Sequence, residues 1–126
     1  MPYTLYDFVD LNETNEFRTW MDNLQPDQLG KLEQKLDMLT LHGEALVPHT
    51  LTDSPVPGIR KLRIHGNVQL RPLLCNGPID HHNEYTLLFG AKEIGGRWSP
   101  RNAPSKAQER KDQVIQSPGE RRKPHE

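Results

Sequence analysis

Apolar and polar residues alternate along residues 58–75, and this pattern predicts the feature around which the rest of the chain is arranged. Leu62 and Ile64 fall on one side of an extended chain, whereas the basic residues beside them fall on the other side. The next run repeats the alternation after a break at Gly66 and Asn67, two residue types that readily form turns. The stretch therefore predicts a β-hairpin with one apolar face and one basic face.

The length of the turn decides which side chains of this hairpin lie opposite one another. Both apolar sets share a face only when an odd number of residues forms the turn, and a three-residue turn over 65–67 meets this condition. Lys61 is then expected opposite Arg71, and Arg63 opposite Gln69. Like charges that face each other destabilise a strand pair, so we interpret this arrangement as one that binds an anion.

A short strand and two amphipathic helices are predicted before the hairpin. Residues 3–11 alternate and contain the aromatic residues typical of strands. Asn12 is the expected N-cap of a first helix, and Pro26 is the expected first residue of a second helix that Gly43 ends. The apolar residues at helical spacing are Phe17, Trp20, Met21 and Leu24 in the first helix and Leu29, Leu32, Leu36 and Leu39 in the second. The two helices form a helical hairpin that needs a sheet to cover its apolar edge.

The remaining patterns predict a single α+β domain over residues 1–115. A third strand at 84–91 extends the hairpin to an antiparallel meander, and Pro72 predicts a bulge or an edge because proline cannot donate a ladder hydrogen bond. A short polar helix is expected at 105–115 and a disordered polar tail at 116–126. The expected fold is an N-terminal strand, a helical hairpin packed on a three- to four-stranded, mainly antiparallel sheet, and a short C-terminal helix.

Composition limits the class of protein. With 126 residues, of which 33% are hydrophobic, the chain has the size of one domain. It has no apolar run near the roughly 20 residues of a membrane span and no signal-peptide pattern, so we expect a cytoplasmic protein without membrane contact. The single cysteine, Cys75, excludes an internal disulfide and is interpreted as a small buried apolar residue. His81 and His82 beside Asp80 fit no closed zinc spacing, and no cofactor motif is present, so neither metal nor cofactor is predicted.

Charge divides the chain into two unlike halves. Residues 1–58 contain three Lys or Arg and ten Asp or Glu, a net charge of −7, whereas residues 59–126 contain thirteen and seven, a net charge of +6. We interpret the division as an acidic helical layer and a basic working face. The plain alternative is a set of scattered, solvated charges, because lysine and arginine favour the surface in any fold.

The order of the predicted elements, together with three short motifs, resembles the RelE/ParE toxin superfamily of toxin–antitoxin systems. The motifs are GIRKLRIHG in the first hairpin strand, VQLRPLL with its Arg71 in the second, and a third strand that ends at Phe89-Gly90 with Lys92 just after it. The likeness is to the phage-derived HigB-like branch, and it implies a RelE-like fold.

The resemblance implies a metal-independent endoribonuclease that cleaves mRNA, often on the ribosome, without a cofactor. Attack of a ribose 2′-hydroxyl on the adjacent phosphate needs a group that takes its proton and cations that stabilise the phosphorane. Matched residue by residue, Arg63 and Arg71 would hold the phosphate through their guanidinium forks. Lys61 and Lys92 would add positive charge, and His65 at the hairpin tip would titrate near neutrality.

The segment after the third strand, residues 92–104, is basic and irregular in pattern, and Trp98 is its candidate for contact with an RNA base. Trp98 lies between Arg97 and Arg101, and aromatic and guanidinium groups stack on unpaired bases in RNA-binding proteins. The simpler interpretation is that Trp98 covers one end of the core. For His65 and the strand arginines, the corresponding simple interpretations are a turn histidine without chemistry and solvated sheet charges.

Partners and alternative functions follow from the same resemblance. A toxin of this kind is neutralised by a cognate antitoxin, here expected to be a helix-turn-helix protein that covers the basic face or displaces the C-terminal helix. Leu70 stands where the family usually has tyrosine, and the pI of about 6.6 is low for a mostly basic family. Two alternatives therefore stay open. One is a ParE-like inhibitor of a protein target such as DNA gyrase, and the other is a phage or mobile-element protein that binds a partner without nuclease activity.

Overall fold

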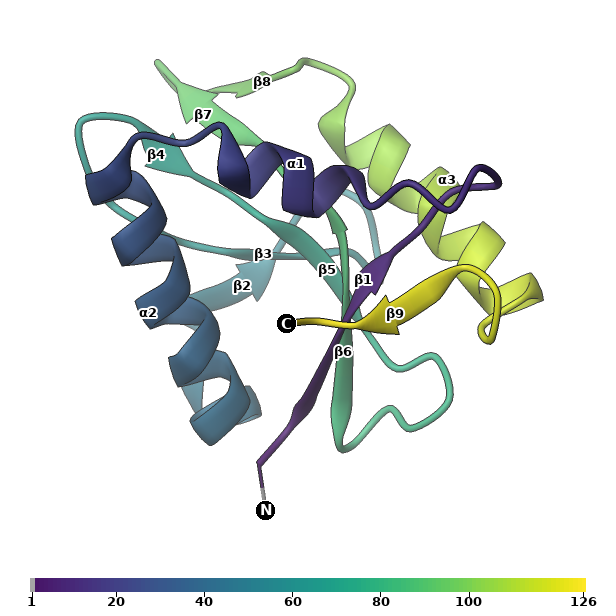
Figure 1. Cartoon of the computed structure of the whole chain (residues 1–126). Coiled ribbons are helices and arrows are strands. Elements are labelled where there is room, and N and C mark those ends of the chain that lie inside the picture. Colours follow the sequence, from purple (N-terminus) through teal and green to yellow (C-terminus); the bar gives the residue numbers. More distant parts are fainter. Residues whose placement is uncertain (1) are drawn as a thin grey trace.

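A six-stranded mixed sheet forms the centre of the molecule, with the strand order β2-β3-β5-β6-β1-β9 (Figure 1). The computed structural model describes residues 2–126. The strands of this sheet are β1 (Thr4–Phe8), β2 (Leu51–Asp53), β3 (Arg60–Leu62), β5 (Leu73–Asn76), β6 (Glu84–Phe89) and β9 (Arg122–Pro124). Strand β1 runs parallel to β6, and the other neighbours are antiparallel. The predicted α+β class and the antiparallel meander are confirmed, while β2 and β9 enlarge the expected three- to four-stranded sheet.

Three α-helices cover the two faces of this sheet (Figure 1). They are α1 (Glu16–Asp22), α2 (Pro26–His42) and α3 (Ala103–Gln116), and a 3₁₀ turn (Gly43–Leu46) follows α2. Helix α2 begins at Pro26, where the missing N–H removes no helical hydrogen bond. It ends before Gly43, whose φ of 49° favours glycine. No helix within residues 2–126 has the length and apolar character needed to cross a lipid bilayer.

The first helix begins later than predicted. Asn15, not Asn12, caps α1, and its side chain accepts a hydrogen bond of 2.9 Å from the backbone N–H of Arg18. The preceding residues form a turn instead, because the Asp10 carboxylate accepts hydrogen bonds from the backbone N–H groups of Asn12 and Thr14. A competing acceptor upstream therefore moves the start of the helix.

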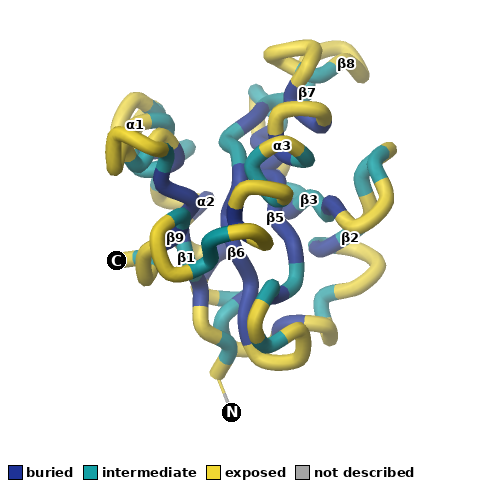
Figure 2. The backbone as a smooth tube through the Cα atoms, turned by 90° about the vertical axis from the view of Figure 1, so that its right-hand side faces the viewer, coloured by how far each residue is buried: buried dark blue, intermediate teal, exposed yellow. Residues whose placement is uncertain are grey.

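Both faces of the central sheet are apolar, and each has its own cluster of buried side chains. In β5, Leu74 belongs to the cluster under α1 and α2, whereas Leu73 and Cys75 belong to the cluster under α3. Figure 2 shows the central strands as the most continuously buried part of the chain. Cys75 is 1% exposed, and burial raises the pKa of its thiol to about 11, which confirms the prediction of a small buried apolar residue. The basic face of the hairpin is limited to the part that α3 leaves uncovered, because α3 packs on β5 and β6.

The hairpin turn is longer than predicted. Lys61 pairs with Leu73, and Ile64 forms an isolated bridge with Leu70, so the five residues 65–69 form the turn. The register is displaced by two residues from the expected one, and the predicted pairing of two cations across the strands is wrong. A displacement by an even number leaves each side chain on its predicted face.

Pro72 separates two short strands and does not lie within either of them. Strand β4 (Gln69–Leu70) ends before it, and β5 begins directly after it. Its carbonyl accepts a 3.0 Å hydrogen bond from the backbone N–H of Leu62, but its own nitrogen cannot donate one. The prediction was a bulge or an edge at this proline; the structure instead shows a break between two strands, and the register shift between Leu73 and Leu74 leaves Leu88 of β6 as the extra residue. The interruption lets the chain pass from a second sheet into the central one.

That second sheet has three short strands in the order β4-β7-β8. Its other members are β7 (Lys92–Ile94) and β8 (Arg97–Ser99), in the segment expected to be irregular. Gly95 and Gly96 join them with φ values of 59° and 77°, a conformation that glycine adopts without strain. Two glycines between extended runs are a known hairpin signal, so the sequence does contain a clue to this element.

The C-terminal residues include an ordered strand, which corrects the prediction of a disordered tail at 116–126. Strand β9 pairs with the outer edge of β1. Arg122 reaches across β1 to Glu84 of β6, and its Nη1 lies 2.5 Å from Glu84 Oε2. His125 Nδ1 lies 2.7 Å from Asp7 Oδ1. The low apolar content of the tail predicted disorder, but charged side chains with buried partners hold it on the sheet.

Candidate anion-binding site

Charged side chains gather where the two sheets meet, around Glu93 of β7. Lys61 of β3 has its Nζ 3.0 Å from Glu93 Oε1, and Arg71, between β4 and β5, has its Nε 3.3 Å from the same oxygen. One carboxylate therefore forms salt bridges with two cations. We call this group the hairpin network, and its members are Lys61, Arg63, His65, Gln69, Arg71 and Glu93.

Every nitrogen of the Arg71 guanidinium is held by the protein's own acceptors. Nη1 donates to the carbonyl oxygens of Leu70 and Ile64 at 2.8 and 3.3 Å, and Nη2 donates to Gln69 Oε1 at 2.7 Å. Nε donates to Glu93, and only 4% of Arg71 is exposed. The side chain therefore fixes the turn and does not present the free fork that the predicted phosphate clamp requires.

Arg63 supplies a free cation next to this buried arginine. Its side chain is half-buried and takes part in no salt bridge within residues 2–126. Desolvation lowers the pKa of Arg71, the charge of Glu93 opposes that shift, and the charge of Arg63 adds to it. The two guanidinium groups therefore lie near enough for the charge of one to disfavour the charge of the other.

His65 lies at the tip of the hairpin and is linked to Arg71 through Gln69. Its Nδ1 lies 3.1 Å from Gln69 Oε1, the oxygen that also accepts from Arg71. An amide oxygen can only accept, so Nδ1 carries the proton and Nε2 of the neutral ring keeps its lone pair. The residue is exposed, so Nε2 is able to take a proton from a bound molecule.

Glu93 is a member of the site that sequence reasoning missed. Desolvation alone would raise the pKa of this carboxyl, but the hydrogen bonds and charges of Lys61 and Arg71 outweigh it and lower the pKa below its ordinary value of 4.5. Glu93 is therefore ionised at neutral pH and holds both cations in place. The glycine pair at Gly95 and Gly96 was the available signal, because it would have placed Glu93 on a strand.

The register of the small sheet divides the other predicted site residues between two faces. Glu93 pairs with Gln69 and with Trp98, so these three side chains share one face. Lys92 pairs with Leu70 and points to the opposite face, away from the hairpin network. The structure does not bring Lys92 together with the predicted phosphate-binding cations, because neighbouring residues of a strand alternate in direction.

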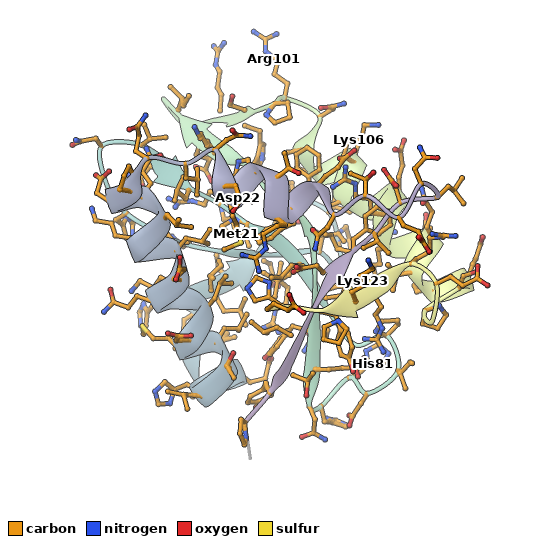
Figure 3. All side chains as sticks on the ribbon, viewed as in Figure 1. Met21, Asp22, His81, Arg101, Lys106 and Lys123 are labelled. Carbon is orange, nitrogen blue, oxygen red and sulfur yellow. The ribbon has the colours of Figure 1, made fainter. Side chains whose placement is uncertain are left out.

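Trp98 borders the site while it packs on the core. It lies half-buried against the cluster under α3, which supports the simpler interpretation, and Lys61 Nζ is 5.5 Å from the centroid of its ring. Arg97 and Arg101 are exposed, and neither forms a salt bridge in the part of the chain that the structure describes. Arg101 points away from the body of the molecule, at the end where β7 and β8 lie (Figure 3). These two arginines lie beside the site and do not cover it.

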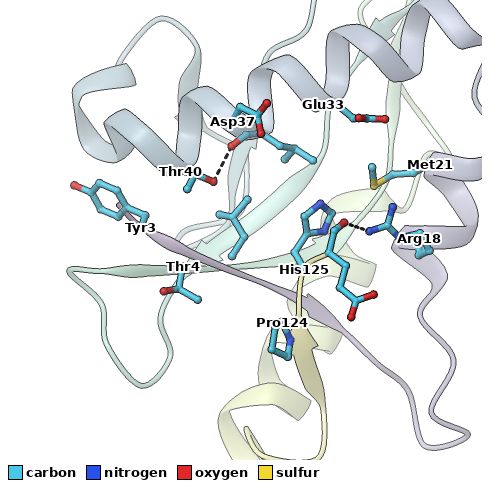
Figure 4. Close-up of a pocket in the computed structure, with 12 residues that line it drawn as sticks. Tyr3, Thr4, Arg18, Met21, Glu33, Asp37, Thr40, Pro124 and His125 are labelled. Carbon is cyan, nitrogen blue, oxygen red and sulfur yellow. Dashed lines mark hydrogen bonds between the residues drawn. The ribbon is translucent and has the colours of Figure 1, made fainter. Parts of the chain in front are cut away.

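Two cavities are lined in part by residues of α2, and only one of them contains a predicted site residue. One of about 250 Å³ lies between the hairpin turn and the start of α2, with His65 in its wall. A larger one of about 550 Å³ lies between α2 and the C-terminal residues, with Arg18, Asp37 and His125 in its walls (Figure 4), and it contains none of the predicted site residues. Among residues 2–126, no three His, Cys, Asp or Glu side chains are arranged to hold a metal ion.

These observations define an α+β protein with a cation-rich face, on which Lys61 and Arg71 share one carboxylate, Arg63 lies near Arg71, and a histidine ring lies at the tip of the hairpin. Comparisons with protein-family models, curated protein sequences and solved structures find no match for this chain. The arrangement of its own residues therefore has to indicate the function. An excess of positive charge suits a polyanion, and a neighbouring proton acceptor suits acid–base chemistry on it.

Proposed function

We propose that this chain is an endoribonuclease of the RelE/ParE type, the toxin component of a toxin–antitoxin system of the phage-derived, HigB-like branch. The observation that carries the proposal is the hairpin network, in which Lys61 and Arg71 share Glu93, Arg63 lies near Arg71, and Gln69 links Arg71 to His65. The order of strand, helical hairpin, meander and C-terminal helix supports it, because the family that the sequence resembles has the same order. The proposed substrate is single-stranded mRNA, free or on the ribosome.

The proposed reaction uses protein side chains alone. The 2′-oxygen of a ribose attacks the adjacent phosphorus and loses its proton to Nε2 of His65, and the bond to the 5′-oxygen breaks. The products are a 2′,3′-cyclic phosphate and a 5′-hydroxyl, whose proton comes from the Lys61 ammonium. Arg63 stabilises the charge that grows on the phosphate oxygens, because no salt bridge within residues 2–126 occupies its guanidinium.

Arg71 and Glu93 are positioning residues in this proposal. Arg71 donates to the carbonyl oxygens of Ile64 and Leu70, which lie at the two ends of the turn that carries His65. Glu93 holds the Lys61 ammonium with a hydrogen bond of 3.0 Å. Small displacements of such groups reduce the rate of a reaction that depends on alignment.

The surface beside the network would extend the contact with RNA. Trp98 offers an aromatic face for an unpaired base, and Arg97 and Arg101 offer exposed cations for phosphates. Phosphate contacts of this kind make affinity dependent on salt. A helix-turn-helix antitoxin would inhibit the toxin by covering the same basic face.

Induction of the protein in a bacterium, followed by mapping of mRNA 5′ ends, tests the proposal. Wild type is expected to arrest growth and to produce new 5′-hydroxyl ends, whereas Arg63→Ala and His65→Ala are expected to remove both effects. Lys123→Ala is the matched control, because Lys123 is also basic but lies exposed on β9 (Figure 3). Undiminished mRNA cleavage by Arg63→Ala would contradict the proposal, as would growth arrest with intact mRNA.

A second candidate is a protein of this fold that binds a partner without cutting RNA. The burial of Arg71 and the pairing of Lys61 with Glu93 favour it, because an active phosphate clamp presents free donors. RNA binding without new mRNA ends would support such a protein. Growth arrest without RNA degradation would instead point to a ParE-like protein target such as DNA gyrase.

A further inference from the structure

The cavity of about 250 Å³ between the hairpin turn and the start of α2 has a polar rim and only a small apolar area inside it. Ile64, Leu70 and Val68 supply the apolar area, and of these only Val68 is half-buried, because Ile64 and Leu70 are each 1% exposed. Asp27 and Lys31 of α2 and Asn67 of the turn line the rim. The volume is below that of a pocket for a drug-sized ligand, so it suits a single planar ring system.

The polar groups on this rim are available to a ligand. The hydrogen bonds around the cavity join Gln25 with Gln28 and His65 with Gln69, and the salt bridges within residues 2–126 do not include Asp27 or Lys31. The Lys31 ammonium extends to the turn, because a Cβ added at Gly66 would lie 3.3 Å from its Nζ. A carboxylate and an ammonium thus line one opening without neutralising each other.

We propose that this cavity binds an unpaired guanine base of the RNA that is cut at the hairpin network, an inference that rests on the proposed function. Among the four RNA bases, guanine alone presents two neighbouring N–H donors on its pairing edge, and a single carboxylate such as that of Asp27 accepts both. Guanine O6 accepts from Lys31 or from the amide of Asn67. The face of the ring packs on Val68, the half-buried apolar residue of the lining.

His65 connects this cavity with the proposed chemistry. It lines the cavity, and its Nδ1 belongs to the hydrogen-bond chain that leads through Gln69 to Arg71. A guanine in the cavity would bring its own ribose next to the imidazole, which lines the cavity. The substrate is then single-stranded RNA that is cut on the 3′ side of guanosine.

Titration of the full chain with the four nucleoside 3′-monophosphates, monitored by backbone amide NMR, tests this inference. Guanosine 3′-monophosphate is expected to bind at least about tenfold more tightly than the other three and to shift the amide signals of residues 25–31 and 64–70. Asp27→Asn is expected to abolish that preference. Asp37→Asn is the matched control, because Asp37 lies on the same helix but lines the larger cavity, and the preference should persist in it.

Two results would overturn the inference: equal affinities for the four nucleotides, or equally tight binding of inorganic phosphate, which would show that the phosphate alone is recognised. The proposed function can fail separately. Guanine-selective binding without RNA cleavage would keep the cavity assignment and remove the nuclease. Cleavage without base preference, unaffected by Asp27→Asn, would keep the nuclease and remove the cavity assignment.

Discussion

Two charge networks in this molecule use the same residue types but differ in their balance. In the first, which we call the terminal network, each anion has its own cation: Glu84 pairs with Arg122, and Asp7 pairs with His125. Three of these four residues are buried. In the hairpin network, by contrast, one carboxylate is shared by two cations, and a third cation, Arg63, has no anion of its own within residues 2–126.

The difference separates charges that stabilise the fold from charges that remain for a ligand. A buried anion and cation that satisfy each other hold two segments together, and removal of one partner leaves the other uncompensated. Cations in excess repel one another, and an anion that binds among them relieves the repulsion. We therefore expect substitutions in the terminal network to affect stability most, and substitutions in the hairpin network to affect RNA binding most.

The largest effect on stability is expected for Arg122→Ala. The substitution leaves Glu84 buried without its cation and removes the contact of the guanidinium with the Tyr6 ring. The free energy of unfolding, measured in urea, should fall by about 3–5 kcal/mol. Lys123→Ala removes an exposed lysine from the same strand and should change it by less than about 0.5 kcal/mol. Equal effects of the two substitutions would show that the ion pair does not anchor β9.

Arg71→Ala should have the next largest effect, because this arginine serves the fold although it belongs to the hairpin network. The Ile64 and Leu70 carbonyl oxygens each lose a charged donor and keep only their backbone donor, at an expected cost of about 1–3 kcal/mol in the free energy of unfolding. Arg63→Ala should leave that free energy within about 0.5 kcal/mol of wild type. Urea unfolding of the two variants side by side measures the contrast. An Arg71→Ala protein as stable as wild type would argue against its role in the turn.

A smaller effect is expected on the pH dependence of the free energy of unfolding, at acid pH. Although desolvation alone would raise the pKa of Glu93, Lys61 and Arg71 hold it below its ordinary value of 4.5. The ionised carboxyl therefore stabilises the fold above about pH 4.5, and this contribution is lost as the pH falls through the lowered native pKa. Urea unfolding between about pH 6 and about pH 3 should show a shallower decline for Glu93→Gln than for wild type. Parallel profiles would indicate that Glu93 does not pair with the two cations.

Local patterns in the sequence predicted most elements of the fold, and long-range partners explain the rest. Helix α2 begins at the predicted Pro26 and ends at His42, directly before the predicted Gly43, and α3 contains the predicted residues 105–115. Strand β9 was not predicted, because its Arg122 is held by Glu84, which lies thirty-eight residues away in the sequence. A segment with few apolar residues is predicted to be disordered. Here a charged partner far away in the sequence orders the segment, and the local pattern does not reveal that partner.

The candidate site was predicted in part. The length of the hairpin turn accounts for much of the difference between the predicted and the observed arrangement. Alternation correctly indicated that Lys61 and Arg71 gather near one another, and both now contact Glu93. With five residues in the turn and not three, the Arg71 guanidinium finds carbonyl oxygens within reach and becomes buried. Lys92 illustrates the second cause, because the face of a strand residue follows from pairing that only the folded structure defines.

The salt dependence of RNA binding tests the central claim most directly, namely that the hairpin network keeps a free cation for phosphate. The affinity of the full chain for a single-stranded 2′-O-methyl RNA, which cannot be cut, is measured at several salt concentrations. For Arg63→Ala we predict lower affinity and a slope of log affinity against log salt that is shallower by about 0.7, the value of one phosphate contact on a single strand. Lys123→Ala should retain the wild-type slope. Identical slopes for wild type, Arg63→Ala and Lys123→Ala would contradict the account.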